Sequence, residues 1–216
     1  MSRKKRHLKV GAKIFFFVEG YTEENYFRKL IQYYKLYTAS TKALFNASAK
    51  KIKVMDGNGD WVEYTKKILT KDPKFRPDSG TRIFIIFDKD QIPDKKIDKM
   101  LKDADDLKVN GSKCQIGLSN CSFEVWLLAH FQKMTPKPIE SSKMWQGQLE
   151  QSLGKYLGKK YKKNKIVNNK QMEKILSDNK VFEAIKNTEK ISQISLEKQS
   201  TNIGQIVSDI LNNRYI

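Results

Sequence analysis

Three carboxylates follow two short apolar runs of this chain, and their spacing suits chemistry on phosphate. Glu19 ends the run IFFFVEG at 14–20, and Asp88 and Asp90 end the run IFIIFDKD at 83–90. Runs this short, continuous and rich in β-branched and aromatic residues are typical of strands buried on both faces of a parallel sheet. Ligand sites of such sheets form at the carboxyl ends of the strands. Carboxylates that meet there repel one another, which costs free energy unless one is protonated or a cation is bound between them. We therefore expect a Mg²⁺ site, with Mn²⁺ as an alternative ion.

Each acidic motif also has an ordinary structural interpretation when it is taken alone. Glu19 followed by Gly20 is typical of a surface glutamate beside a tight turn, and a D-x-D triplet is a weak signal by itself. Both motifs together are a stronger signal, because Asp88 and Asp90 would project to one side of an extended chain. The three carboxylates could hold one or two Mg²⁺ ions, and two ions would sit roughly 3.5–4 Å apart. Lys89, which would point to the other side, is a candidate substrate-binding residue.

A second group of candidates surrounds the apolar segment SFEVWLLAHF at 122–131. Burying an unpaired Glu124 there would cost on the order of several kcal/mol. We therefore expect Glu124 either to have a partner or face a polar cleft, where it would be a substrate-binding residue, or to be an acid that the helix dipole stabilises. Asn120 is either a turn or cap residue or a second substrate-binding residue. His130 is expected to be a hydrogen-bonded core histidine rather than a general base.

Charge is the strongest feature of the composition. The 216 residues include 42 Lys and Arg and 24 Asp and Glu, which gives a net charge of +18. This favours a polyanionic partner, nucleic acid above all, although an excess made mostly of lysine could also reflect a biased genome. We find neither a signal peptide nor a segment long enough to span a membrane, and we expect a cytoplasmic protein. Cys114 and Cys121 are then packing residues, and with His7 and His130 they lack the spacing of a zinc site.

The elements that must position these residues alternate between strand and helix. Strands are predicted within 14–20 and at 51–57, 82–87 and 114–120, and helices at 22–36, 60–70, near 94–108 and at 122–131. Thr22 is the expected N-cap of the first helix, with Glu23 and Glu24 in its first turn. This order favours an α/β fold with a mostly parallel sheet and right-handed crossovers.

Three regions are expected along the chain. Residues 1–13 would form a flexible basic arm, residues 14–134 the α/β core, and residues 135–216 a basic helical extension that packs on the core. Within this extension, Tyr156 and Tyr161 lie among six lysines, which are Lys155, Lys159, Lys160, Lys162, Lys163 and Lys165. Lysines interleaved with aromatics either track a phosphate backbone or form a solvated helix face. The sequence contains no GxxxxGK[ST] loop, so ATP hydrolysis by this chain is not expected.

Four segments resemble the RloB family, which includes AbiLii-type abortive-infection proteins. They are VEGYTEENYF at 18–27, FDKD at 87–90, LSNCSFEVWLLAHF at 118–131 and STNIGQIVSDIL at 200–211. In that family the corresponding motifs run like EG-x-TE-x-x-YF, FD-x-D, SNP-x-FE-x-WLLLHF and a T-N pair leading into a helix. Cys121 stands where the family often has proline, which loosens the turn but removes no ligand.

The RloB family is similar in turn to Toprim domains, the Mg²⁺-binding folds of primases, topoisomerases and OLD-type nucleases. The resemblance implies that Glu19 is the Toprim glutamate and that Asp88 and Asp90 are its metal pair. The residues that match the other motif positions are Glu23, Asn120 and Glu124. RloB-like proteins are often encoded beside an ATPase in phage-defence systems, so the resemblance also implies an ATPase partner.

The leading hypothesis is a Toprim-like, Mg²⁺-dependent nuclease of an antiphage abortive-infection system, acting on DNA or on a structured RNA such as tRNA. Glu19, Asp88 and Asp90 would hold the metal, Glu19 or Glu23 would take a proton from the attacking water, and a nearby lysine would offset charge. One alternative is a non-catalytic nucleic-acid sensor or regulatory subunit. Another is a nucleotidyl- or phosphotransferase with the same metal cluster. The sequence leaves open whether the chain forms a homo-oligomer.

Overall fold

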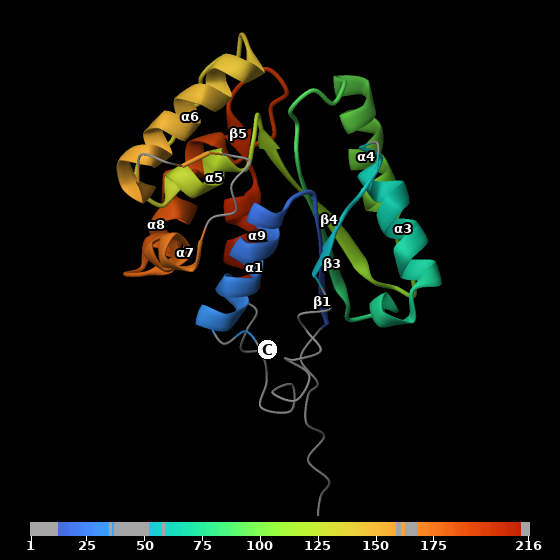
Figure 1. Ribbon diagram of the computed structural model, residues 1–216. Helices are drawn as coiled ribbons and strands as arrows, with labels where there is room; N and C mark the ends of the chain where they lie inside the picture. Colours follow the sequence, from blue (N-terminus) through green and yellow to red (C-terminus); the bar gives the residue numbers. More distant parts are fainter. Residues whose placement is uncertain are drawn as a thin grey trace, which may run out of the picture.

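A sheet of five strands separates two layers of helices in the computed structural model of this chain (Figure 1). The structure describes residues 13–34, 36, 52–57, 59–158, 161–162 and 168–212. The strands are β1 (Ile14–Val18), β2 (Ile52–Val54), β3 (Arg82–Asp88), β4 (Lys113–Asn120) and β5 (Ser200–Thr201). They lie in the order β2-β1-β3-β4-β5, with β1 to β4 parallel and β5 antiparallel to β4. The predicted α/β class and mostly parallel sheet are confirmed.

The two central strands are apolar because both of their faces are covered. In β1, Phe15 and Phe17 face one hydrophobic cluster, while Phe16 and Val18 face the other. The same alternation divides the side chains of β3 between the two clusters, and all of its residues after Arg82 are buried. A strand buried on both faces reads as a continuous apolar run, which is why these two strands were recognisable in the sequence.

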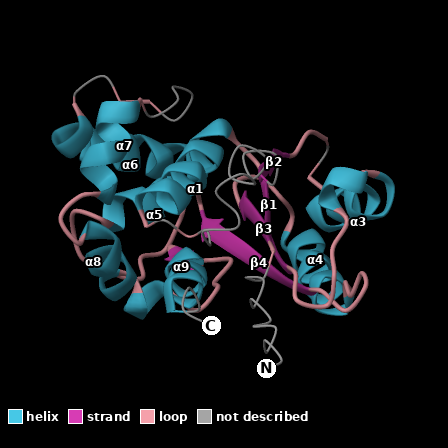
Figure 2. Cartoon of the chain, turned by 90° about the horizontal axis from the view of Figure 1, so that it is seen from below, coloured by secondary structure: helices cyan, strands magenta, loops and turns pink. Residues whose placement is uncertain are grey.

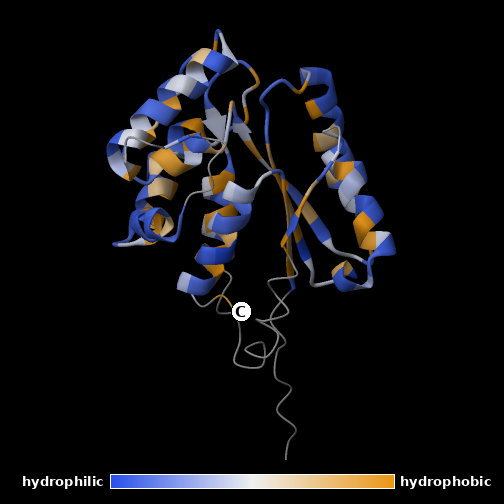
Figure 3. Ribbon diagram, in the orientation of Figure 1, coloured by the Kyte–Doolittle hydropathy of each residue, from blue (hydrophilic) through white to orange (hydrophobic). Residues whose placement is uncertain are grey.

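One face of the sheet carries the helices α3 (Trp61–Lys71) and α4 (Asp94–Asp106) (Figure 2). The short 3₁₀ helix η3 (Pro73–Phe75) follows α3 in the chain and precedes β3. Trp61 and Val62 of α3, and Ile97 and Met100 of α4, are buried against the odd-numbered residues of β1 and β3. Figure 3 shows hydrophobic residues alternating with hydrophilic ones along both helices. These helices follow β2 and β3, so both of them start at the carboxyl edge of the sheet.

The opposite face is covered by the remaining helices among the described residues. They are α1 (Tyr21–Tyr33), α5 (Glu124–Ala129), α6 (Ser142–Leu157), α7 (Asn169–Leu176), α8 (Lys180–Asn187), η4 (Glu189–Ile191) and α9 (Ile203–Asn212). Helix α9 lies close to β4 because Gly117 has no side chain. A Cβ atom at Gly117 would come within 2.7 Å of Ile203 Cδ1 and 2.9 Å of Ile206 Cδ1. One hydrophobic cluster therefore joins the strands to helices from both halves of the chain.

The start of α1 differs from the prediction. Gly20, and not Thr22, is the N-cap residue, and its carbonyl accepts the N–H of Glu24 at 3.1 Å. The expected Thr22 cap was wrong because the helix starts at once after β1. Gly20 also has no room for a side chain, since a Cβ atom there would lie 2.6 Å from the carboxylate Oε2 of Glu23. The tight turn between β1 and α1 thus depends on glycine.

The C-terminal residues contain a strand that the sequence analysis did not predict. β5 pairs with the end of β4, so that Thr201 lies opposite Ser119 and Ser200 opposite Asn120. Just after β5, the side-chain amide of Asn202 accepts the N–H of Leu118 at 2.8 Å and donates to the carbonyl of Ile116 at 2.8 Å. A side chain thereby continues the backbone pairing of β4. This gives the T-N pair of the fourth motif a structural role at the sheet edge.

Several predictions lie outside the described residues, namely those for residues 1–12, for His7, and for Lys159, Lys160, Lys163 and Lys165. Of the cysteines, Cys121 is buried in one hydrophobic cluster and Cys114 packs against the other, which confirms that they are packing residues. Within the described part of the chain, every helix is too short or too polar to cross a membrane.

Candidate functional site

Two of the predicted acids meet at the carboxyl edge of the sheet. Glu19 follows β1, and its backbone N–H donates to the carbonyl of Ile86 in β3 at 3.0 Å. Its carboxylate Oε2 accepts the backbone N–H of Asp88 at 2.8 Å. Asp88 is the last residue of β3 and is only 4% exposed. Parallel pairing of β1 and β3 therefore brings the two motifs together from positions 69 residues apart.

The third predicted acid is arranged differently from the expectation. β3 ends at Asp88, and the chain then turns toward β4: the N–H of Lys89 donates to Ser119 O at 2.9 Å and that of Asp90 to Cys121 O at 3.2 Å. Asp90 has a φ of +36° and an exposed side chain. The expectation that Asp88 and Asp90 share one side of an extended strand was wrong, because the segment bends to pair with the end of β4.

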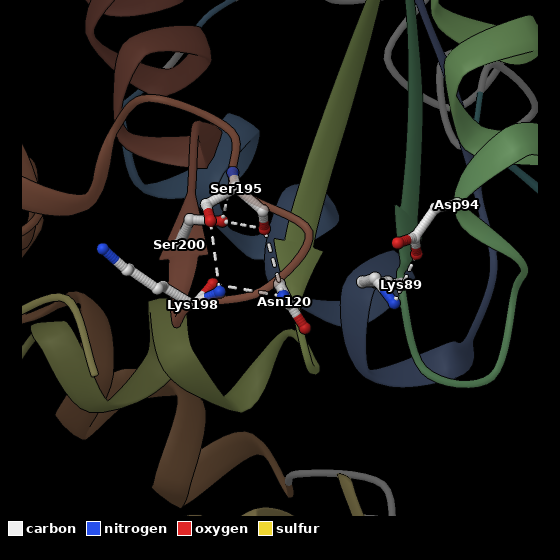
Figure 4. A network of polar contacts seen from close by, with 6 residues as sticks. All are labelled: Lys89, Asp94, Asn120, Ser195, Lys198 and Ser200. Carbon is white, nitrogen blue, oxygen red and sulfur yellow. Dashed lines mark hydrogen bonds and ion pairs between the residues drawn. The ribbon is translucent and has the colours of Figure 1, made fainter. Parts of the chain in front are cut away.

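Lys89 lies beside this turn and has a partner of its own. Its ammonium Nζ lies 2.9 Å from Asp94 Oδ1, at the first residue of α4 (Figure 4). The lysine side chain is only 16% exposed, whereas that of Asp94 is 57% exposed. A positive charge is thus held one residue away from Asp88.

The donor set at this edge suits a hard cation in part. Among the described residues, no three His, Cys, Asp or Glu side chains are grouped so that they could hold a metal ion. Glu19 and Asp88 remain as a pair of carboxylates on neighbouring strands. Mg²⁺ commonly takes one or two carboxylates and completes its shell with water and phosphate oxygens. Glu19 and Asp88 supply the number of carboxylates that such an open site uses, and the contact between them joins the Glu19 carboxylate to the backbone N–H of Asp88.

Asn120 binds the loop that leads into β5. Its side-chain Nδ2 donates to Ser195 O at 3.0 Å and to Lys198 O at 3.1 Å, which uses both amide protons (Figure 4). Ser200 Oγ also donates to Ser195 O at 3.0 Å. The loop is therefore fixed at the carboxyl edge, and the Lys198 side chain points away from Asn120 in Figure 4. Asn120 is neither the predicted cap of α5, whose N-cap residue is Phe123, nor part of the turn before it, and substrate binding by Asn120 stays a prediction.

A second group of acids lies around Tyr161. Glu124, the first residue of α5, is 2% exposed, and its Oε1 accepts the phenol O–H of Tyr161 at 2.8 Å. Its Oε2 is buried and has no hydrogen-bond partner among the described residues. Glu23 is 6% exposed in the first turn of α1. Burial raises the pKa of Tyr161, and the negative charges of Glu124, Glu23 and Glu150 raise it further.

Only one member of this second hydrogen-bonded pair was predicted from the sequence. Glu124 was recognised as a buried acid, but its partner was not, because Tyr161 lies in a lysine-rich segment that reads as surface. Tyr161 is only 5% exposed, and the neighbouring Lys162 pairs with Glu150 at 3.1 Å. Buried side-chain oxygens usually have a hydrogen-bond partner, so Glu124 Oε2 is an exception among the described residues.

The aromatic residues of the basic segment do not form a free stacking surface. Tyr161 is buried, and the Tyr156 ring stacks on Phe131 with centroids 4.7 Å apart and an interplanar angle of 8°. Both rings therefore pack against the protein, and the choice between a segment that tracks a phosphate backbone and a solvated helix face stays a prediction. Lys155 is exposed.

His130 is a core residue, as predicted. It is fully buried, its Nδ1–H donates to Trp126 O at 2.9 Å, and its Nε2 lies 3.1 Å from Tyr26 Oη. Because only a protonated Nδ1 can bond a carbonyl, neutral His130 accepts the Tyr26 O–H through Nε2. Burial lowers the pKa of His130 to about 3, so its ring is neutral near pH 7. Both of its ring nitrogens are thus engaged within the core.

Comparison with known proteins identifies the family. A family model described as RloB-like protein matches residues 14–210. Neither a curated protein nor a solved structure was found to match the chain. The matched residues run from β1 to α9 and so include both groups of acids, Asn120 and the Thr201–Asn202 pair. Since the match covers nearly the whole chain, this protein belongs to the RloB-like family.

Proposed function

We propose that this chain is a Toprim-like, Mg²⁺-dependent nuclease, the effector of an antiphage abortive-infection system, with Mn²⁺ able to replace Mg²⁺. The observation that carries the proposal is the 2.8 Å contact between the Glu19 carboxylate and the N–H of Asp88, which joins two acids at the ligand-binding edge of a parallel sheet. The net charge of +18 supports a nucleic-acid substrate.

Each acid has a proposed role. Glu19 and Asp88 hold the ion, and Asp90, on the exposed turn just beyond, is the third ligand candidate. The bound ion would polarise a phosphoryl oxygen and lower the pKa of a bound water. Glu23, buried beside Gly20, accepts a proton from the attacking water as general base. The first turn of α1 thus supplies the base, and β1 and β3 supply the ligands.

Substrate binding is assigned to the residues that flank these acids. Lys89 brings a positive charge next to Asp88 and offsets that of the phosphate. Asn120 has used its amide protons and keeps Oδ1 as an acceptor. Glu124 would repel phosphate, so its free oxygen suits a sugar hydroxyl or an exocyclic amine of the base.

A cleavage assay on several substrates tests the proposal. Purified protein is incubated with total tRNA, supercoiled plasmid or single-stranded DNA, in Mg²⁺, in Mn²⁺ or in EDTA. The proposal predicts cleavage of at least one substrate with either metal and none in EDTA. If all substrates stay intact in every metal-containing reaction, the proposal that this chain by itself is a nuclease is contradicted. Adding ATP should leave the rate unchanged, since an ATPase partner rather than this chain would respond to ATP.

A non-catalytic nucleic-acid-binding subunit is the second candidate, and one observation favours it. Glu19 Oε2 is occupied by a backbone hydrogen bond, and the acids at this edge do not form a three-ligand metal group among the described residues. In that case Glu19 would mainly stabilise the junction of β1 and β3. Such a subunit would bind nucleic acid in EDTA, with an affinity that falls steeply with salt, and would cleave none of the substrates.

A further inference from the structure

An aromatic side chain stands exposed at the edge of the candidate site. Tyr21 is the first residue of α1 and follows Glu19 and Gly20 directly. It is 62% exposed. Its position is fixed from both sides, because the N–H of Glu19 is bonded to β3 and the carbonyl of Gly20 accepts the N–H of Glu24. The phenol ring is therefore held at the start of α1, two residues after Glu19, whereas the buried Glu23 lies on a different face of the same helix.

Tyr21 differs from the other exposed aromatic residues of the described chain. The ring of Tyr33 lies 5.1 Å from that of Tyr34, and Phe182 lies 5.9 Å from the same ring, both edge-on. The Tyr21 side chain has no ring contact, hydrogen bond or ion pair with the residues that the structure describes. A single exposed aromatic is common, so the place of Tyr21 beside the acids, and not its exposure, carries the argument.

The charge around Tyr21 limits what can bind there. Glu19 lies two residues before it, and a carboxylate repels the phosphates of a nucleic-acid strand. Glu24 is paired with Arg28, and Glu23 is only 6% exposed. An aromatic face attracts a nucleobase without regard to charge, and such stacking is worth about 1–3 kcal/mol per base. A ring at this point offsets the repulsion by holding the base rather than the phosphate. Only an unpaired base offers a free face for this contact.

We propose that Tyr21 stacks on an unpaired nucleobase next to the phosphate at the acidic edge, so that this protein prefers single strands, loops or overhangs to continuous duplex. The inference rests on the proposed function for the presence of nucleic acid at this edge. It adds the class of substrate, which the acids alone do not determine.

Binding measurements in EDTA test the stacking separately from cleavage. Fluorescein-labelled oligonucleotides, one single-stranded, one duplex and one single-stranded with abasic sites throughout, are titrated with protein and followed by anisotropy. We expect Tyr21→Ala to weaken binding of the single strand by about ten-fold or more and Tyr21→Phe to bind like the original chain. Tyr33→Ala, at the other end of the same helix, is the matched control and should bind unchanged.

The abasic strand isolates the base contact. With the bases removed, Tyr21→Ala should bind as well as the original chain, because there is no ring for Tyr21 to stack on. Equal binding of the ordinary single strand by Tyr21→Ala and the original chain would overturn the stacking proposal while leaving the nuclease proposal standing. Absence of binding to all three oligonucleotides by the original chain would overturn the stacking proposal as well, whereas the nuclease proposal is decided by the cleavage assay in Mg²⁺ and Mn²⁺.

Discussion

The carboxylate of Glu19 accepts the backbone N–H of Asp88 at 2.8 Å, and this contact ties the end of β1 to the end of β3. The acid thus has two roles. It satisfies a backbone donor where the pairing of the two strands ends, and it places a negative charge beside Asp88. A substitution that keeps the first role and removes the second can separate structure from chemistry.

Glu19→Gln is that substitution. The glutamine amide oxygen still accepts the Asp88 N–H, so the thermal midpoint should change by no more than a few degrees, as expected for a change within about 0.5–1 kcal/mol. Loss of one of two paired charges should weaken Mn²⁺ binding at least about ten-fold, measured by the free-ion signal in electron paramagnetic resonance. Asp106→Asn at the exposed end of α4 should bind Mn²⁺ like the original chain. Unchanged affinity in Glu19→Gln would remove Glu19 from the ligand set.

The contact of Tyr161 with Glu124 should stabilise the fold. Tyr161→Phe leaves both oxygens of a buried carboxylate without a partner, which should cost about 1–3 kcal/mol of unfolding free energy in urea. Tyr156→Phe loses only an exposed 3.4 Å hydrogen bond to Gln132 and should change it by less than about 0.5 kcal/mol.

A double-mutant cycle checks that Glu124 is the cause. In a Glu124→Gln background, where no charge is buried, Tyr161→Phe should cost clearly less than it does alone. If the two losses simply add, the hydrogen bond does not couple the two residues.

Burial of His130 predicts acid sensitivity. Its folded pKa of about 3 lies below the ordinary value of 6.5, so the folded state binds fewer protons than the unfolded chain. The contribution to stability is complete above pH 6.5 and is lost as the pH falls toward 3, by about 2 kcal/mol at pH 5. His130→Gln should therefore show a flatter decline of unfolding free energy between pH 6.5 and pH 5. Parallel pH profiles for the two proteins would mean that His130 is protonated in the folded state.

Asn202 should stabilise the edge of the sheet. Asn202→Ala leaves the N–H of Leu118 and the carbonyl of Ile116 unpaired in a buried strand, at a cost on the order of 3 kcal/mol. Hydrogen exchange at the Leu118 amide should accelerate in step with this loss. Asn212→Ala, near the exposed end of α9, is the control and should leave both quantities near their original values. A Leu118 amide that stays protected would place its hydrogen bond elsewhere.

The parts of the fold that could be predicted are those with a strong apolar pattern. β1 and β3 are continuous apolar runs because both of their faces are buried, and the acids at their ends followed from the same pattern. β5 could not be predicted, since Ser200 and Thr201 are polar and form a strand only through pairing with Ser119 and Asn120. The turn at Asp90 could not be predicted either, because it forms through backbone hydrogen bonds to residues at the end of β4.

The acids of the candidate site could be predicted from the sequence, but the residues that contact them could not. Glu19, Asp88 and Glu124 were identified from their places in the sequence, but Tyr161 was read as a surface residue because lysines surround it. It is buried in a hydrophobic cluster and bonds Glu124, which is 37 residues away in the chain. Contacts of this kind, between a polar residue and a distant buried charge, leave no periodic pattern in a sequence.

Cleavage by matched variants is the most direct test of the proposed nuclease. The initial rate on the best substrate in Mg²⁺ is measured for the original chain, for Glu19→Gln and for Asp106→Asn, with circular dichroism to confirm that all three are folded. The proposal predicts that Glu19→Gln loses about 100-fold or more of the rate while Asp106→Asn keeps it. Cleavage by Glu19→Gln at the original rate would contradict the assignment of the sheet edge as the active site.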